Sequence, residues 1–175
     1  MFRACRTIVV LSATALVIFT GGTAMRAQTT PPKPKPKAAT VAKHTILKAS
    51  QMQWGPAPDS LPAGAQMTVL DGDPSKPGSF VIRAKLPDGY KVPPHWHPSD
   101  EHVSVISGTF LIGIGDTWDD KKITALDAGG YAKLPKNHHH YAGAKGETII
   151  QIHAVGPFAI TYLNPDDDPR TKKAQ

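Results

Sequence analysis

Short runs of β-branched, aromatic and other apolar residues recur from residue 44 onward, roughly once every ten residues. Turn residues separate them, as at Asp71-Gly72-Asp73-Pro74 and Pro87-Asp88-Gly89. No segment sustains a helical apolar stripe beyond two turns. The runs are 45–48, 67–70, 79–86, 102–106, 109–114, 122–126, 131–134, 139–142, 148–155 and 158–163. This spacing predicts an all-β sandwich or barrel, with residues 44–175 forming one domain and a polar C-terminal tail.

Residues 1–27 have the pattern of a secretory signal peptide. Two arginines, Arg3 and Arg6, precede an apolar run over residues 7–19, and small residues follow it. Cleavage after Ala24 or Ala27 is expected, which makes the protein exported, either periplasmic or secreted. An uncleaved membrane anchor is the alternative, but the apolar run is shorter than a transmembrane helix requires. No stable membrane insertion is therefore expected after cleavage.

Residues 28–43 alternate proline and lysine and show no apolar periodicity. Such a segment favours an extended, solvated conformation held open by repulsion between like charges, so it is predicted to be a linker. A contact between its lysines and an anionic surface polymer or lipid is the alternative to a plain spacer.

The net charge of +6 belongs to these leading segments rather than to the predicted domain. Without their basic residues, 13 Lys and Arg face 14 Asp and Glu, so the domain is nearly neutral. Nucleic-acid binding would need basic residues clustered on one face of the domain, and the sequence shows no such cluster. The single cysteine, Cys5, lies in the signal segment, so the exported protein is expected to contain no disulfide. The basic residues removed in this count are Arg3, Arg6, Arg26, Lys33, Lys35, Lys37 and Lys43.

The stretch 89–108 contains the residues best suited to chemistry. His95 and His97 differ by two positions, so on a strand both imidazoles project from one face. Glu101 begins the next run and shares a strand face with Val103 and Val105, which would place its carboxylate in an apolar interior. Burying an unpaired carboxylate is costly unless a cation is present. The pattern therefore predicts half of a metal site.

The same stretch resembles the first motif of the cupin family, G(X)5HXH(X)3-4E(X)6G, which Gly89, His95, His97, Glu101 and Gly108 match without a gap. The second motif, G(X)5PXG(X)2H(X)3N, is approximated by Gly129, Pro135 and His140. Asn137 stands at its second glycine and Ala144 at its asparagine. Asparagine tolerates a left-handed backbone, so the turn at Asn137 is expected to persist. Ala144 cannot supply the role of an asparagine side chain.

The resemblance covers roughly residues 46–163 and implies a cupin-type double-stranded β-helix, which is a jelly-roll barrel. It also implies one metal ion held by His95, His97, Glu101 and His140, and a homodimer. Counting from Pro135 selects His140 among three consecutive histidines. Strand alternation would then turn His139 away and place His138 on the face of His140, either lining the pocket or solvated.

Residues 148–155 alternate Gln151 and His153 with isoleucine and alanine. These two polar side chains are expected to line the metal chamber, because Ile149 and Val155 on the same face suggest that this face is buried. An exposed polar face is the alternative.

Three imidazoles and one carboxylate suit Fe, Mn, Zn, Ni, Cu and Co alike and leave coordination positions open. The first hypothesis is a metal-dependent enzyme, an oxygenase or related oxidoreductase. In it Glu101 also serves as a base, and the substrate is a small anionic or phenolic molecule. The second is a non-catalytic module that binds or senses a small ligand through the metal. A purely structural metal ranks last, because a closed barrel of this length already buries a sufficient core.

Overall fold

The computed structural model describes residues 44–171, so the predicted signal peptide and linker lie outside the described residues. The strands are β1 (Gly55–Pro56), β2 (Gln66–Asp71), β3 (Gly78–Leu86), β4 (Lys91–Trp96), β5 (Glu101–Ile114), β6 (Thr124–Asp127), β7 (Tyr131–Leu134), β8 (His140–Gly156) and β9 (Thr161–Tyr162). Four short 3-10 helices accompany them: η1 (Ala49–Gln51), η2 (Asp120–Lys122), η3 (Pro165–Asp167) and η4 (Pro169–Thr171). None of the helices in this described part is long and apolar enough to cross a bilayer.

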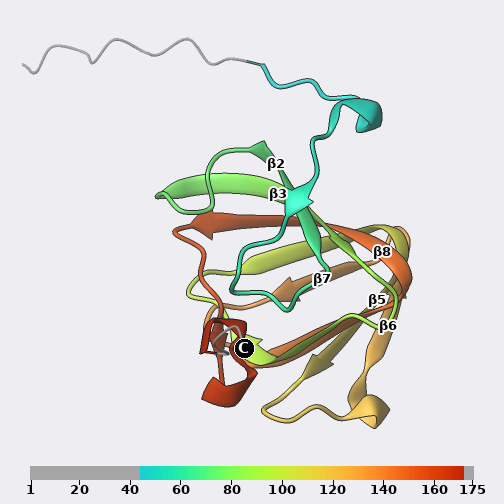
Figure 1. Cartoon of the computed structure of the whole chain (residues 1–175), viewed down its shortest axis with the longest axis vertical. Helices are drawn as coiled ribbons and strands as arrows, with labels where there is room; N and C mark the ends of the chain where they lie inside the picture. Colours follow the sequence, from blue (N-terminus) through green and yellow to red (C-terminus); the bar gives the residue numbers. More distant parts are fainter. Residues whose placement is uncertain (1–43, 172–175) are drawn as a thin grey trace, which may run out of the picture. The chain divides into compact units, whose positions relative to one another are not determined.

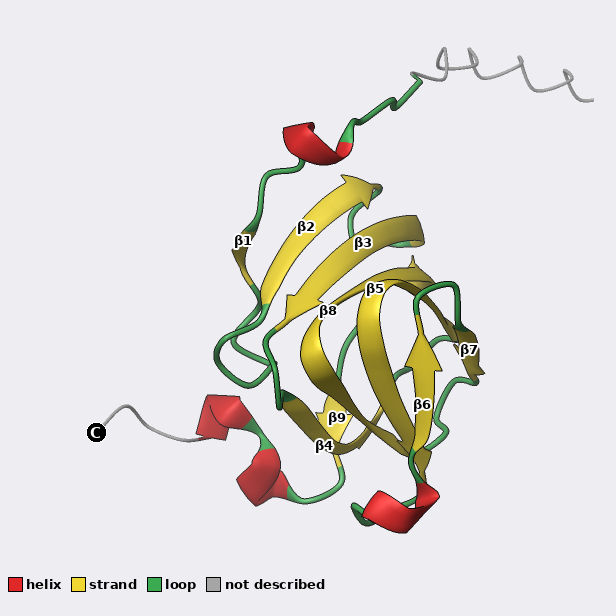
Figure 2. Ribbon diagram, turned by 90° about the vertical axis from the view of Figure 1, so that its right-hand side faces the viewer, coloured by secondary structure: helices red, strands yellow, loops and turns green. Residues whose placement is uncertain are grey.

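The two long strands, β5 and β8, run antiparallel side by side (Figure 2), and β3, β4, β6 and β7 pair with one or the other of them. The second half of β8 pairs with β3, which in turn pairs with β2, whereas its first half pairs with β4. Likewise β5 pairs with β7 through its first half and with β6 through its second half. The strands thus form one curled antiparallel sheet with two halves that share β5 and β8 (Figure 1). The predicted jelly-roll barrel is confirmed.

Strand β5 bends at Gly108, and this bend allows it to belong to both halves of the sheet. The pairing of β5 with β8 shifts register between Val105 and Thr109, on either side of this glycine. Gly108 has φ +76°, and a Cβ there would overlap the backbone carbonyl of Glu147. A side chain at this position would therefore meet both a strained backbone and a steric clash. The closing glycine of the first motif allows β5 and β8 to turn together.

Period-two alternation places the inner face of the barrel as expected along β5. Val103 and Val105 are buried, and across the pair Ile150 and Ile152 of β8 are buried too. They belong to a single core cluster that includes Phe80, the largest apolar side chain in it that is almost fully enclosed. This aliphatic interior surrounds the candidate site described below.

Several predicted element boundaries were wrong. Residues 45–48 form no strand, and Ile46 is 88% exposed ahead of η1. Of the run 158–163 only β9 is a strand. Conversely, the predicted runs 102–106 and 109–114 are both part of the single strand β5, and the runs 139–142 and 148–155 are joined in β8. In both strands the backbone pairing continues through the glycines that interrupt the apolar pattern.

Candidate metal centre

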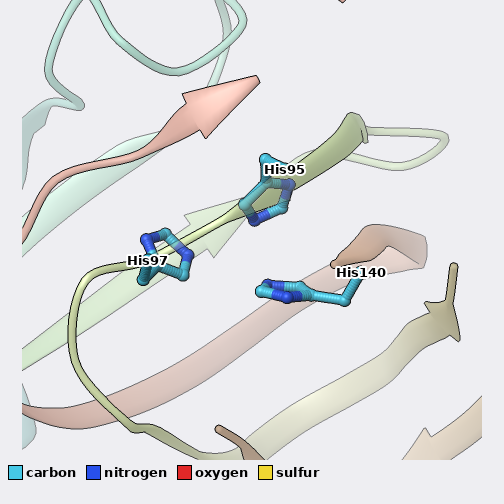
Figure 3. A group of neighbouring side chains, drawn as sticks. All are labelled: His95, His97 and His140. Atoms are coloured by element: carbon cyan, nitrogen blue, oxygen red, sulfur yellow. The ribbon is translucent and has the colours of Figure 1, made fainter. Parts of the chain in front are cut away.

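Three histidines from two strands meet at one end of the barrel interior. His95 lies on β4, His97 follows directly after it, and His140 begins β8, where it pairs with His95. Each offers a ring nitrogen, and these nitrogens lie within 4.8 Å of one another. Figure 3 shows the three rings gathered around one point, with His95 and His97 coming from one segment and His140 from another. All three side chains are buried.

Each of these imidazoles is oriented by a backbone carbonyl. The Nδ1 atom of His95 lies 2.7 Å from the carbonyl oxygen of Pro93, that of His97 lies 2.7 Å from Ala159, and that of His140 lies 3.0 Å from His138. A carbonyl only accepts, so each Nδ1 carries the proton and donates. The Nε2 lone pairs are then free to act as ligands, and the tautomer is fixed in the way typical of metal-binding histidine.

Glu101 brings a carboxylate beside two of the three histidines. Its Oε2 atom lies 3.6 Å from Nε2 of His97 and 3.6 Å from Nε2 of His140, and its side chain is buried. Ligands that each lie about 2.0–2.2 Å from one ion are about 3–3.5 Å apart. The separations from His97 and His140 are close to those of a coordination shell, whereas the group of ligand atoms that all lie within 4.8 Å of one another comprises the three histidines without Glu101. Three nitrogens with one carboxylate oxygen would suit a borderline divalent metal.

Burial sets the protonation states of the group. It lowers the pKa of His97 to about 4, against the opposing effect of the Ala159 carbonyl. It also lowers the pKa of His95, which the nearby His140 and His97 depress further, and that of His140, where Glu101 opposes the shift. For Glu101, burial raises the pKa to about 6, and His140 counteracts this. At neutral pH the site therefore presents neutral imidazoles and an ionised carboxylate, which is the form that binds metal.

Aromatic residues outside the two motifs hold the histidine cluster. The ring of Phe158 stacks on that of His97, with centroids 4.3 Å apart and an interplanar angle of 17°, and Phe80 packs edge-on against Phe158 at 5.3 Å. Tyr162 lies 6.0 Å from the ring of His95. The sequence placed Phe158 only in a predicted strand. Its stacking position depends on the turn after β8, which no period-two pattern describes.

The turn before His140 contains Asn137, which stands where the second cupin motif has glycine. Asn137 has φ +59°, which makes it the only non-glycine residue with a positive φ among residues 44–171. The expectation that asparagine replaces glycine in this turn is confirmed. Asp100, which directly precedes Glu101 in the first motif, is bonded to the same segment: its carboxylate accepts from the backbone amide of Lys136 at 2.9 Å and pairs with Lys133 at 2.9 Å.

His139 points away as expected, and of the two alternatives left open for His138, lining the pocket or being solvated, the structure has the solvated one. His139 points away from the cluster, and its Nδ1 lies 2.7 Å from a carboxylate oxygen of Asp116. His138 is exposed and does not line the cavity. The reason is that residues 135–139 form a turn and β8 begins at His140, so strand alternation does not extend back to His138.

The favoured expectation that Gln151 and His153 line the chamber is wrong, and the alternative of a polar face outside the chamber holds. Ile150 and Ile152 face the cavity, whereas His153 and Val155 are exposed on the outer face of the sheet. There Gln151 accepts a hydrogen bond from Arg83 at 2.9 Å and contacts Nε2 of His153 at 2.8 Å. The two polar side chains form an exterior network rather than a chamber wall.

A cavity of about 120 Å³ adjoins the cluster. Its polar end is formed by His95, His97, Glu101 and His140, and apolar side chains provide most of the remaining wall. A metal at the cluster would therefore face a partly enclosed apolar space next to its open coordination positions. Such a space is suited to a small organic ligand.

The comparisons with known proteins agree with this fold. A family model described as "Domain of unknown function (DUF4437)" matches residues 26–161. No curated protein sequence matches the chain. The polyketide cyclase RemF from Streptomyces resistomycificus has a similar structure, with a TM-score of 0.61 at 12% identity, covering 73% of this chain and 90% of that one.

Two further solved structures are similar at the level of the fold. A provisionally assigned acetylacetone dioxygenase from Methylibium petroleiphilum has a TM-score of 0.57 at 20% identity, covering 74% of this chain and 88% of its own. An RmlC-like cupin from Shewanella frigidimarina has a TM-score of 0.50 at 16% identity, covering 65% and 91% respectively. At these identities the similarity establishes the architecture, and the chemistry has to be argued from the site.

Proposed function

The chain belongs to the DUF4437 family and has the cupin fold, and from this premise we propose that it binds one divalent transition metal through His95, His97, Glu101 and His140. The convergence of three imidazoles, each with its Nδ1 committed to a backbone carbonyl, carries the proposal. If the buried histidines were only structural, three acceptor nitrogens would not be expected to face one another beside a buried carboxylate.

Metal binding is tested directly on the chain after chelation and reloading. We expect one equivalent of metal per chain by elemental analysis. His140→Ala should lower the affinity at least 100-fold, because it removes a ligand. His139→Ala is the matched control, since this adjacent imidazole points toward Asp116 and should leave affinity unchanged. Equal affinity of His140→Ala and the unmodified chain would refute the site.

We propose further that the bound metal supports oxygenase or related oxidoreductase chemistry on a small molecule. The metal would act as a Lewis acid or as an electron conduit for substrate and dioxygen at its open positions. The protein's part is to hold the substrate in the apolar cavity, exclude bulk water, and supply Glu101 as a base. The cyclase and dioxygenase among the structural relatives support an enzymatic role for this fold.

A metal-dependent binding or sensor module is the second candidate. It is favoured by the composition of the cavity wall, in which Glu101 is the one carboxylate and no lysine or arginine is present. The two candidates separate when Fe-, Mn- and Cu-loaded protein is tested against small phenols and organic acids. Oxygen uptake or product formation in any metal form supports the enzyme, whereas ligand-induced thermal stabilisation without turnover supports the module.

From residues 1–27 we also propose export, which N-terminal sequencing of the mature protein tests. The homodimer implied by the cupin resemblance remains a proposal that light scattering of the loaded protein tests.

A further inference from the structure

We infer that the cavity selects molecules with an apolar body no larger than about one six-membered ring and a single oxygen head group of at most one negative charge. The inference rests on the proposed function, because the head group is expected to bind the metal. It narrows the ligand class that the sequence left open as anionic or phenolic, and it excludes dicarboxylates and polyols.

The first argument is the absence of cationic side chains from the cavity wall. Glu101 is the only acidic or basic residue among the lining residues apart from the three imidazoles. Two lysines next in sequence to lining residues contact aromatic rings instead: Lys85 lies 4.8 Å from the ring centroid of Trp54, and Lys91 lies 4.5 Å from that of Trp118. A second carboxylate on the ligand would be buried without a counter-charge, which is strongly unfavourable.

The second argument is the shortage of hydrogen-bond partners. Tyr90 and Ser60 are the only lining residues with a side-chain hydroxyl. The Tyr90 hydroxyl donates to the carbonyl of Pro62 at 2.6 Å, and burial raises the pKa of this phenol, so it stays neutral. A ligand with several hydroxyl groups would leave most of them unpaired inside the barrel.

The third argument is size. The cavity volume of about 120 Å³ is slightly below the roughly 150 Å³ of an engineered apolar cavity that binds benzene. Its wall is mainly aliphatic, with Ile82, Ile150 and Ile152 on the β3 and β8 side. Each methylene buried there should tighten binding by about fourfold until the space is filled.

Charge balance at the centre leads to the same limit. A divalent ion, ionised Glu101 and three neutral imidazoles together carry one net positive charge, which one anionic head group neutralises. A dianion would leave an excess negative charge in the same apolar surroundings. The charge balance limits the head group to one negative charge, and the apolar lining of the cavity requires an apolar body.

Calorimetry on the chain loaded with redox-inert Zn²⁺ tests the inference without turnover. The probes are acetate, propanoate, butanoate and pentanoate, with succinate and glutarate as dianions matched in carbon number. Affinity should rise about fourfold per methylene through the series until the cavity is filled. Succinate should bind at least 100-fold more weakly than butanoate. Succinate within threefold of butanoate, or no dependence on chain length, would overturn the inference.

The two levels of the proposal fail differently. If the chain takes up no metal, or if acetate binds equally with and without metal, the proposed function itself is wrong. If metal and acetate bind as expected but the dianions match the monoanions, only the ligand class is wrong.

Two cavity variants distinguish an effect of cavity size from an effect of general destabilisation. Ala84→Leu fills part of the cavity and should move the best-bound chain to a shorter carboxylate, whereas Ile152→Ala enlarges the cavity and should move it to a longer one. Both changes destabilise the core, so a non-specific effect would shift both series in the same direction. Unchanged chain-length preference in two folded variants would show that the ligand body lies elsewhere.

Discussion

The backbone amide of Asn137 donates a hydrogen bond of 2.8 Å to the carbonyl of His97. This bond joins the turn of the second motif to a proposed ligand of the first, and Asn137 then redirects the chain by its left-handed conformation at φ +59°. His140 lies three residues further on. The turn therefore contributes to the relative position of His97 and His140, together with the pairing of His140 with His95.

Substitutions at Asn137 should separate the backbone requirement from the side chain. Asn137→Gly keeps the left-handed conformation accessible, so the free energy of unfolding should stay within about 0.5 kcal/mol of the unmodified protein. Asn137→Val disfavours that conformation and should cost about 1–2 kcal/mol, together with a loss of metal affinity because His140 shifts. Urea unfolding and metal titration measure both. Equal behaviour of the two variants would show that the turn does not position His140.

Counting along the motifs was enough to identify the fold and the residues that converge. It selected His140 from three consecutive histidines because Pro135 fixes where the turn begins, and the closing Gly108 marked the bend of β5. These positions are constrained by local backbone conformation, which spacing in the sequence reflects. The remainder of the site depends on contacts between segments far apart in the chain.

Strand alternation was a poor guide to which face is inside. In β8 both faces carry isoleucine, with Ile149 on one and Ile150 on the other. The period of two therefore separated the two faces but could not show which of them is buried. Pairing with β3 and β5 decides the matter, and it turns Gln151 outward beside Arg83. The stacking of Phe158 on His97 is equally non-local, since it follows from the turn between β8 and β9.

Glu101→Gln should affect the metal-free and metal-bound proteins in opposite directions. Without metal, the buried carboxylate is unfavourable, as its pKa of about 6 shows, so a neutral amide should raise the free energy of unfolding by about 1 kcal/mol at neutral pH. With metal, loss of the anionic ligand should weaken affinity by about 10- to 100-fold. Thermal unfolding with and without metal measures both the expected gain in stability of the metal-free protein and the expected loss in the metal-bound protein.

Glu147→Gln is the matched control for this substitution. Glu147 is the only other glutamate in the chain, and it is exposed. It should leave both the unfolding free energy and the metal affinity unchanged within about 0.5 kcal/mol. If Glu101→Gln destabilised the metal-free protein instead, the carboxylate would have a structural partner that outweighs its burial.

The metal-free protein should lose stability on acidification between pH 6.5 and about 4. In this window an unfolded histidine binds a proton, whereas His97, with its pKa of about 4 in the folded state, does not. Each such group makes the unfolding free energy fall by up to about 1.4 kcal/mol per pH unit as pH decreases. Burial lowers the pKa values of His95 and His140 as well, so the three histidines act in the same direction.

Glu101 opposes this trend over part of the range. Its folded-state pKa of about 6 exceeds the ordinary value of 4.5, so between these values the folded protein binds the extra proton and gains stability as pH decreases. Glu101→Gln removes that opposing effect, and its stability should fall more steeply between pH 6 and 4.5. Denaturant titrations at several pH values compare the two slopes. Parallel curves would mean that Glu101 does not titrate in this range.

The two glycines of the first motif should tolerate alanine unequally. Both have positive φ, +70° at Gly89 and +76° at Gly108, so alanine is strained at each by about 1 kcal/mol. A Cβ at Gly89 has no neighbour within 4 Å, whereas one at Gly108 would overlap the carbonyl of Glu147 and approach Thr148. Gly108→Ala should therefore cost about 1–3 kcal/mol more than Gly89→Ala, since β5 and β8 must separate at their shared bend. Equal losses in urea unfolding would show that the strands relax there freely, and that Gly108 is needed for its backbone conformation alone.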